Sequence, residues 1–231
     1  MRILGTWVAV LTAVLIASCG APSQAQTPEP FVVKGRVVDE AGRPIARAEI
    51  VVDNEFLYNS NVTGRTGADG RYRISLPRVA STWNVTGTAT QVVGGQSITV
   101  DLDPDNPDSL AGNAGAVRNF TARTSGTRPD GGSYGGWAII YPPYDAMYQP
   151  TEVRLHFQPL DGGTAFSRQI ENTGAGSAVK DVPIGRYRIS ATRGGRPMQI
   201  RPRNRGAFSS SITSGFNEVR SGYFELEMDV Q

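Results

Sequence analysis

The densest group of candidate metal ligands in this 231-residue chain lies between positions 101 and 108. This stretch reads Asp-Leu-Asp-Pro-Asp-Asn-Pro-Asp, and calcium loops present carboxylate oxygens at a similar spacing. Its two prolines stiffen the loop, and the glycine and the glutamate expected of an EF-hand loop are missing. The pattern therefore favours a solvated acidic loop. The alternative is a calcium site with these candidate ligands: Asp101, Asp103, Asp105 and Asp108.

The chain has one histidine and one cysteine, which leaves little material for catalysis. His156 alternates onto the same strand face as Arg154 and Gln158, so we expect a polar, solvent-facing side chain without a catalytic or ligand role. A lone Cys19 excludes an intramolecular disulfide framework and a cysteine-based zinc site. A glycosidase would need two facing carboxylates about 5–9 Å apart, and no spacing here indicates such a pair. We therefore predict no catalytic residue and no cofactor.

Aromatic residues gather between positions 134 and 148, around the pair Pro142-Pro143. Aromatic rings stack on sugars, and they also supply large contact areas in protein cores and interfaces. The favoured interpretation places Trp137 and Tyr141 in a core and the other rings around a loop. The alternative is a ligand-stacking surface, which two exposed, coplanar rings would support. Its candidate residues are Trp137, Tyr141, Tyr144 and Tyr148.

The N-terminus has the pattern of an export signal. Residues 3–17 are uncharged and mostly apolar, which matches a secretory hydrophobic region and is shorter than the ~20 residues of a membrane span. The run ends Ile16-Ala17-Ser18-Cys19, which resembles the bacterial lipoprotein signal of an aliphatic residue, two small residues and a cysteine.

This resemblance implies that residues 1–18 are a signal peptide and that Cys19 becomes the lipidated first residue of the mature protein. Residues 19–30 then form the lipid anchor and a flexible, Pro- and Gln-rich tether. In a Gram-negative host, Gly20 after the cysteine resembles lipoproteins sent to the outer membrane. The alternative is ordinary secretion, with cleavage after Ala25 and a soluble secreted or periplasmic product.

The elements that position these residues are strands. Residues 71–76 alternate, so Tyr72, Ile74 and Leu76 point to one face, and the preceding Asp69-Gly70 is a turn pair. We expect residues 61–66 to pair with 71–76 across that turn. The hexapeptide Gly-Arg-Tyr-Arg-Ile-Ser at 70–75 recurs at 185–190, which indicates two β modules with matching strands.

Four motifs in the first module resemble one known family. They are Gly35-Arg-Val-Val-Asp, Gly42-Arg-Pro-Ile-Ala, Ala48-Glu-Ile-Val-Val and Thr66-Gly-Ala-Asp-Gly-Arg-Tyr, and together they are similar to the carboxypeptidase regulatory-like family over residues 32–90. The resemblance implies a transthyretin-like β-sandwich related to starch-binding-like folds. It implies no peptidase activity, because a zinc peptidase site needs several histidine or carboxylate ligands and this chain has one histidine.

The predicted fold is therefore all-β, with two immunoglobulin-like or transthyretin-like sandwiches in tandem. We expect the first sandwich at residues 31–124, a flexible linker at 125–136 and a second, diverged sandwich at 137–231. A net charge of only +2 gives no electrostatic case for nucleic acid.

The sequence thus favours a non-catalytic bacterial cell-envelope lipoprotein whose sandwiches act in binding or as structural spacers. The expected partners are the membrane, through Cys19, and a glycan or an envelope protein. The alternative function is a carbohydrate-binding module protein at the cell surface, by analogy of fold with the starch-binding-like relatives.

Overall fold

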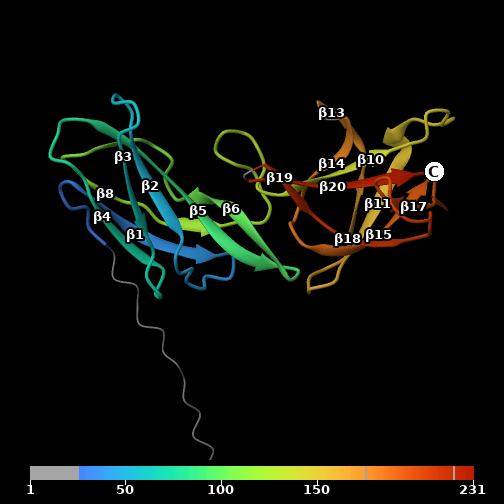
Figure 1. The fold of residues 1–231 in the computed structure, drawn as a ribbon, viewed down its shortest axis with the longest axis horizontal. Coiled ribbons are helices and arrows are strands. Elements are labelled where there is room, and N and C mark those ends of the chain that lie inside the picture. Colours follow the sequence, from blue (N-terminus) through green and yellow to red (C-terminus); the bar gives the residue numbers. More distant parts are fainter. Residues whose placement is uncertain (1–25, 175, 221) are drawn as a thin grey trace, which may run out of the picture.

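The computed structural model describes residues 26–174, 176–220 and 222–231. Within them the chain is all-β, apart from one short 3-10 helix, η1 (Pro150–Glu152). The strands form two groups that lie side by side along the long axis of the molecule (Figure 1). We call β1–β9 the first half and β10–β20 the second half. In the described part of the chain, no helix has the length and apolar character that a membrane crossing requires.

The first half is one sheet that curls round on itself. Its strands are β1 (Val32–Asp39), β2 (Glu49–Asn54), β3 (Asn61–Arg65), β4 (Arg71–Ser75), β5 (Thr82–Val93), β6 (Gln96–Pro104), β7 (Leu110–Ala111), β8 (Ala116–Val117) and β9 (Phe120–Ala122). They follow the order β3-β2-β5-β6-β9-β1-β4, with β7 on β5 and β8 on β1. The two end strands, β3 and β4, lie against each other. Ile74 of β4 packs so closely on Gly64 of β3 that a Cβ added at Gly64 would lie 2.6 Å from Ile74 Cγ1. The curled sheet encloses the buried side chains of Ile50, Trp83 and Phe120.

The expected pairing of residues 61–66 with 71–76 is wrong. β3 pairs with β2, where Val62 lies opposite Val52, and β4 pairs with β1. The turn itself forms as the residue types predict, since Gly70 N donates to Gly67 O at 3.0 Å and Gly70 has a positive φ of 74°. The turn therefore joins the two ends of the curled sheet. Alternation shows which face of a strand is buried, but it does not identify the neighbouring strand.

One close approach explains the glycine that opens the first family motif. Gly35 lies opposite Tyr72, and a Cβ added at Gly35 would lie only 1.7 Å from the carbonyl oxygen of Arg118. The hydroxyl of Tyr72 donates to that same carbonyl at 2.7 Å. Because Gly35 has no side chain, the carbonyl of Arg118 can come close enough to accept the hydrogen bond of the buried Tyr72 hydroxyl.

The second half is a sandwich of two sheets. Its strands are β10 (Gly136–Tyr141), β11 (Val153–Pro159), β12 (Phe166–Gln169), β13 (Glu171–Thr173), β14 (Gly176–Val182), β15 (Arg186–Arg193), β16 (Arg196–Pro197), β17 (Ile200–Pro202), β18 (Ile212–Gly215), β19 (Asn217–Arg220) and β20 (Tyr223–Val230). One sheet has the order β13-β14-β10-β20-β17, with β19 on β20. The other has the order β12-β11-β15-β16, with β18 on β15. Their inward side chains alternate as predicted: Leu155 and Phe157 of β11 and Leu226 of β20 are buried in the same core.

The two identical hexapeptides occupy different positions, so the expectation of matching places is wrong. β4 ends the path of the first sheet, whereas β15 lies between β11 and β18. Both tyrosines are buried. However, Tyr72 has one aromatic neighbour, whereas Tyr187 makes edge contacts with three rings, those of Phe157, Phe166 and Phe216. The shared pattern specifies an inward-facing tyrosine, and the surrounding chain decides where its strand is placed.

Candidate functional site

The structure does not bring the four aspartates of residues 101–108 together around a cation. Asp101 pairs with Arg128, and Asp103 pairs with Arg123. Asp105 accepts hydrogen bonds from the backbone and side chain of Asn119. Asp108 lies exposed beyond the end of β6. Among the described residues, no group of three or more histidines, cysteines or carboxylates is placed to hold a metal ion.

The four candidate stacking residues do not form a platform. Trp137 and Tyr141 are half-buried on the outer face of β10, while Ala138 and Ile140 between them face the core. The expectation that these two rings are core residues is therefore wrong. Tyr148 packs on the surface, with its hydroxyl donating to Val230 O at 3.0 Å. Tyr144 is fully exposed, and no two of the four rings contact each other.

Cations cover three of these aromatic rings. The Arg203 guanidinium lies 3.8 Å from the centre of the Tyr141 ring, and Arg193 lies 4.7 Å from that of Tyr148. The Lys180 ammonium lies 5.6 Å from the centre of the Trp137 ring. Such contacts hold a cation in place on a ring face and occupy the surface that a neutral sugar would use.

His156 lies on the polar face of β11, as alternation predicts, and two hydroxyls fix its ring. Its Nδ1 lies 2.7 Å from Ser167 Oγ on β12, and its Nε2 lies 2.8 Å from Thr192 Oγ1 on β15. Both ring nitrogens thus have structural partners on the neighbouring strands. Cys19, the proposed lipidation site, lies outside the described residues.

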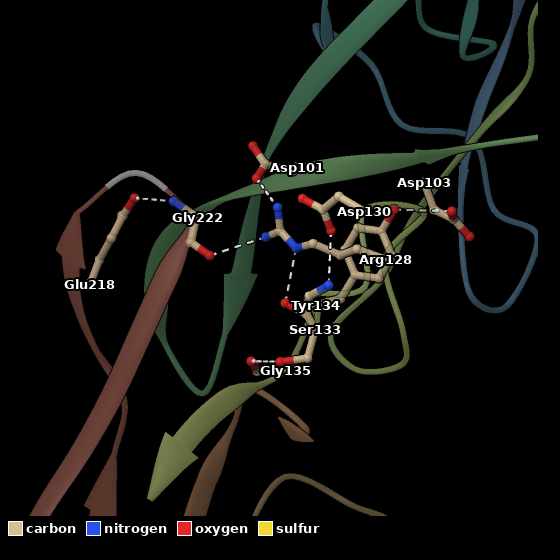
Figure 2. Close-up of polar contacts among 10 residues, drawn as sticks. Asp101, Asp103, Arg128, Asp130, Ser133, Tyr134, Gly135, Glu218 and Gly222 are labelled. Carbon is tan, nitrogen blue, oxygen red and sulfur yellow. Dashed lines mark hydrogen bonds and ion pairs between the residues drawn. The ribbon is translucent and has the colours of Figure 1, made fainter. Parts of the chain in front are cut away.

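The arrangement with the most convergent polar groups is the junction between the halves, centred on Arg128 (Figure 2). Arg128 Nη1 donates to Asp101 Oδ2 of β6 at 2.6 Å, and Nη2 donates to the carbonyl of Gly222, next to β20, at 3.2 Å. Its Nε donates to Ser133 O at 2.9 Å, which closes the loop of residues 128–133. One side chain therefore ties both halves and the segment that connects them.

Tyr134 makes a second tie at the junction. Its ring is buried beneath the Arg128 guanidinium at 5.0 Å, and its hydroxyl donates to Asp103 Oδ1 at 3.0 Å. Burial is the main cause that raises the pKa of Tyr134, and the hydrogen bond to Asp103 is the second cause. The hydroxyl therefore stays protonated and remains a donor. On the other side, Asp181 Oδ1 accepts from the backbone N–H of Gly126 and Gly135 at 2.8 and 3.1 Å. Residues 125–136, expected to be a flexible linker, are thus hydrogen-bonded to both halves.

The tip of the β5–β6 hairpin makes a separate contact between the halves. Gly94 has a positive φ of 59°, and a Cβ added there would lie 2.6 Å from Arg186 Cγ of β15. Arg186 also pairs with Asp161 at 3.0 Å. The hairpin therefore approaches the second half as closely as a glycine permits, well away from Arg128 along β6.

A cleft of about 570 Å³ lies beside Arg128, between strands β2, β5 and β6 on one side and residues 128–134 on the other. Its polar groups include the carboxylates of Glu49, Asp101 and Asp130 and the hydroxyls of Thr86 and Thr88. These groups can hydrogen-bond a polar ligand. The residues lining this cleft include no serine, cysteine, histidine or lysine.

The sequence reasoning missed this junction. Arg128 and Asp130 lie in a Gly- and Ser-rich stretch, whose composition is typical of a loop, and the partners of Arg128 are 27 and 94 residues away. The available signal was an arginine and a tyrosine, Arg128 and Tyr134, in an otherwise small-residue segment. A linker without structural contacts has little need of either side chain.

The curled sheet defines the first half as a β-sandwich module, and the comparison with protein families identifies it. Residues 32–111 match the model of the family described as carboxypeptidase regulatory-like domain, from the first residue of β1 to the last residue of β7. The first half therefore contains a carboxypeptidase regulatory-like domain, and the resemblance stated from the motifs is confirmed. A search of the curated proteins finds no match to this chain.

Solved structures resemble this chain distantly. The Bacillus anthracis TIE protein is 15% identical at a TM-score of 0.36, with 87% of this chain and 34% of that chain covered. One B repeat unit of the collagen-binding surface protein of Staphylococcus aureus is 10% identical at a TM-score of 0.27, with 87% of this chain and 98% of that chain covered. A streptococcal ancillary pilin is 9% identical at a TM-score of 0.29, with 87% of this chain and 62% of that chain covered. The chain thus spans about a third of the first structure's length.

Proposed function

We propose that this protein is a non-catalytic cell-envelope lipoprotein whose two β-sandwich modules form one stiff unit for binding or spacing. In this proposal residues 1–18 are removed on export, and Cys19 carries the lipid. Residues 19–30 are the tether, and residues 31–124 and 137–231 are the modules. The junction at residues 125–136 fixes their relative orientation.

The Arg128 bridge between Asp101 and the Gly222 carbonyl carries the stiff-unit part of the proposal, and the motif that ends at Cys19 carries the lipid anchor. A spacer or a two-module binding surface needs a defined geometry, because each mobile joint adds conformational entropy that binding must overcome. The bridge, the buried Tyr134 and the β5–β6 tip supply three separate restraints on that geometry. The cleft beside Arg128 lies between the first module and residues 128–134, so its shape depends on the contacts of Arg128 and Tyr134.

The lipid and the tether set where this unit acts. A single acyl chain binds a membrane only marginally, at about 0.8 kcal/mol for each buried methylene, whereas the several chains of a bacterial lipoprotein anchor firmly. Glu29 is held on the first module by Arg73 and Lys34, so the free tether is shorter than residues 19–30 and ends before Glu29. Residues 20–28, fully extended, reach at most about 30 Å. The proposed location is therefore the outer membrane or cell surface.

Fractionation of a bacterial host that expresses the full chain tests this proposal. We expect the wild type in the membrane fraction with a fatty-acid label, and Cys19→Ala in the soluble fraction without the label. A matched control, Ser18→Ala, keeps a small residue before the cysteine and should remain in the membrane. A wholly soluble wild type with its N-terminus at Gln26 would contradict the proposal and support ordinary secretion.

A further inference from the structure

The second half contains a strongly basic stretch that neither the family match nor the proposed role explains. Between Asp181 and Glu218 the sequence has seven arginines and no lysine, aspartate or glutamate, although the whole chain has a net charge of only +2. These residues are Arg186, Arg188, Arg193, Arg196, Arg201, Arg203 and Arg205. Two of them, Arg201 and Arg203, converge at the end of the molecule away from the first half, where β17 meets the end of β20 (Figure 1).

A buried carboxylate fixes these two arginines. Asp229, only 5% exposed, accepts from Arg201 Nε at Oδ2, at 2.7 Å, and from Arg203 Nη1 at Oδ1. The backbone N–H of Asn204 donates to the same Oδ2 at 3.0 Å. The two guanidiniums are therefore held against the two oxygens of one carboxylate, and the group of three retains one positive charge.

Aromatic rings fix the other faces of the guanidiniums. Arg203 stacks on Tyr141 at 3.8 Å, and Arg201 lies over Phe208 at 4.6 Å. Tyr141 is itself held, because its hydroxyl donates to Glu227 Oε1 at 2.6 Å. Glu227 is a second carboxylate at this end of the sheet, so Arg201, Arg203, Asp229 and Glu227 together carry no net charge, and the arginines contribute N–H donors. The arginines are thus immobilised before any ligand arrives, which lowers the entropic cost of binding.

A cleft of about 370 Å³ opens over this pair. Arg201 Nη2 and Arg203 Nε and Nη2 donate to no other group in the described part of the chain. The cleft is also lined by Pro142, Pro143 and the fully exposed Tyr144, and by Val230 and Gln231 at the end of β20. The cleft therefore offers fixed, unused guanidinium N–H donors together with the rings of Pro143 and Tyr144.

We propose that this cleft binds an acidic saccharide. Its carboxylate or phosphate accepts hydrogen bonds from the free N–H groups of Arg201 and Arg203, because guanidinium forks match planar and tetrahedral oxyanions. Its sugar ring lies against Tyr144 and Pro143, as sugar faces do on aromatic and proline rings. Tyr141 positions Arg203 and does not contact the sugar. The site is separate from the Arg128 junction and does not depend on the lipid anchor.

Titration calorimetry on residues 27–231 tests the proposal with four probes: D-glucuronate, glucose 6-phosphate, glucose and inorganic phosphate, at matched ionic strength. We expect both acidic sugars to bind, and glucose and inorganic phosphate to bind at least about tenfold more weakly, because each offers only half of the contacts. Tyr144→Ala removes a fully exposed ring and should weaken the acidic sugars several-fold without changing inorganic phosphate.

Arg203→Gln should abolish binding of the acidic sugars. Because that change also leaves Asp229 short of a partner, the double variant Arg203→Gln/Asp229→Asn keeps the local charge balanced and should lose binding equally. The control Arg188→Gln, on the exposed face of β15, should bind as the wild type does. The proposal is overturned if no acidic sugar binds, if Arg203→Gln binds unchanged, or if inorganic phosphate binds as tightly as glucose 6-phosphate.

Discussion

Arg128 lies 2.6 Å from Asp101, and this ion pair joins the connecting segment to β6 of the first half. The guanidinium is mostly buried, with 16% of the side chain exposed, whereas the Asp101 side chain is 36% exposed. The pair therefore lies between the regimes of a surface and a buried salt bridge. Its other hydrogen bonds, to Ser133 O and Gly222 O, make it a structural connection between the halves.

Loss of this connection should loosen the junction. Arg128→Gln is expected to cost about 1–3 kcal/mol in the free energy of unfolding, because charge-assisted hydrogen bonds to three acceptors are lost. The connecting segment should also become sensitive to limited proteolysis. The control Arg71→Gln removes an exposed pair with Asp69 at 3.7 Å and should cost at most ~1 kcal/mol. Equal protease resistance of Arg128→Gln and the wild type would show that the bridge does not hold the junction.

A single methyl group at Gly35 should destabilise the first half. Its Cβ would lie 1.7 Å from Arg118 O, so either the backbone moves or the Tyr72 hydrogen bond breaks. We expect Gly35→Ala to cost at least about 2–3 kcal/mol in denaturant unfolding. Gly174→Ala, where nothing lies within 4 Å, is the matched control and should change stability little. Equal stability of the two variants would refute this explanation of the motif glycine.

The two repeated tyrosines should differ in their effects. Truncation of a buried aromatic to alanine costs ~3–5 kcal/mol, and Tyr187→Ala should lie at the upper end because three rings contact it. Tyr72→Ala should expose mainly the first half and Tyr187→Ala mainly the second, as measured by hydrogen exchange resolved along the chain. Loss of protection in both halves with either variant would instead indicate one cooperative unit.

Acid should destabilise the second half through Asp229. Burial would raise its pKa, but hydrogen bonds from Arg203, from Asn204 N and from Arg201 outweigh burial and lower it below the ordinary value of 3.8. A group with a lowered folded-state pKa stabilises the protein fully above the unfolded-state pKa. This contribution is lost as the pH falls through the folded-state pKa.

The corresponding measurement is chemical unfolding from pH 6 down to about pH 2, below the ordinary aspartate range. Asp229→Asn should be less stable than the wild type at pH 6, and the difference should shrink below pH 3.8. The control is Asp145→Asn, an exposed aspartate on the β10–η1 connection, and it should follow the wild type throughout. A constant difference between Asp229→Asn and the wild type over this range would disprove the linkage.

The sequence by itself determined the buried face of several strands and the position of a turn. Alternation placed Tyr72 and Phe157 inside and His156 on the polar face, and Asp69-Gly70 marked a turn that forms. These are local properties: a strand has a period of two, and a positive φ at a turn requires few residue types. The family motifs likewise record local needs, such as the space at Gly35 for a neighbouring carbonyl.

Only the tertiary structure decided which strands are neighbours and which charges meet. β3 pairs with β2 and β4 pairs with β1, so the strands on either side of the Asp69-Gly70 turn end opposite sides of one sheet path. The identical hexapeptides become an end strand in one half and an internal strand in the other. Arg128 pairs with Asp101, and Asp229 pairs with both Arg201 and Arg203. The partners in each of these pairs are 26 to 28 residues apart in the sequence. Such partners depend on how strands far apart in the chain pack together, and spacing within a strand does not encode that choice.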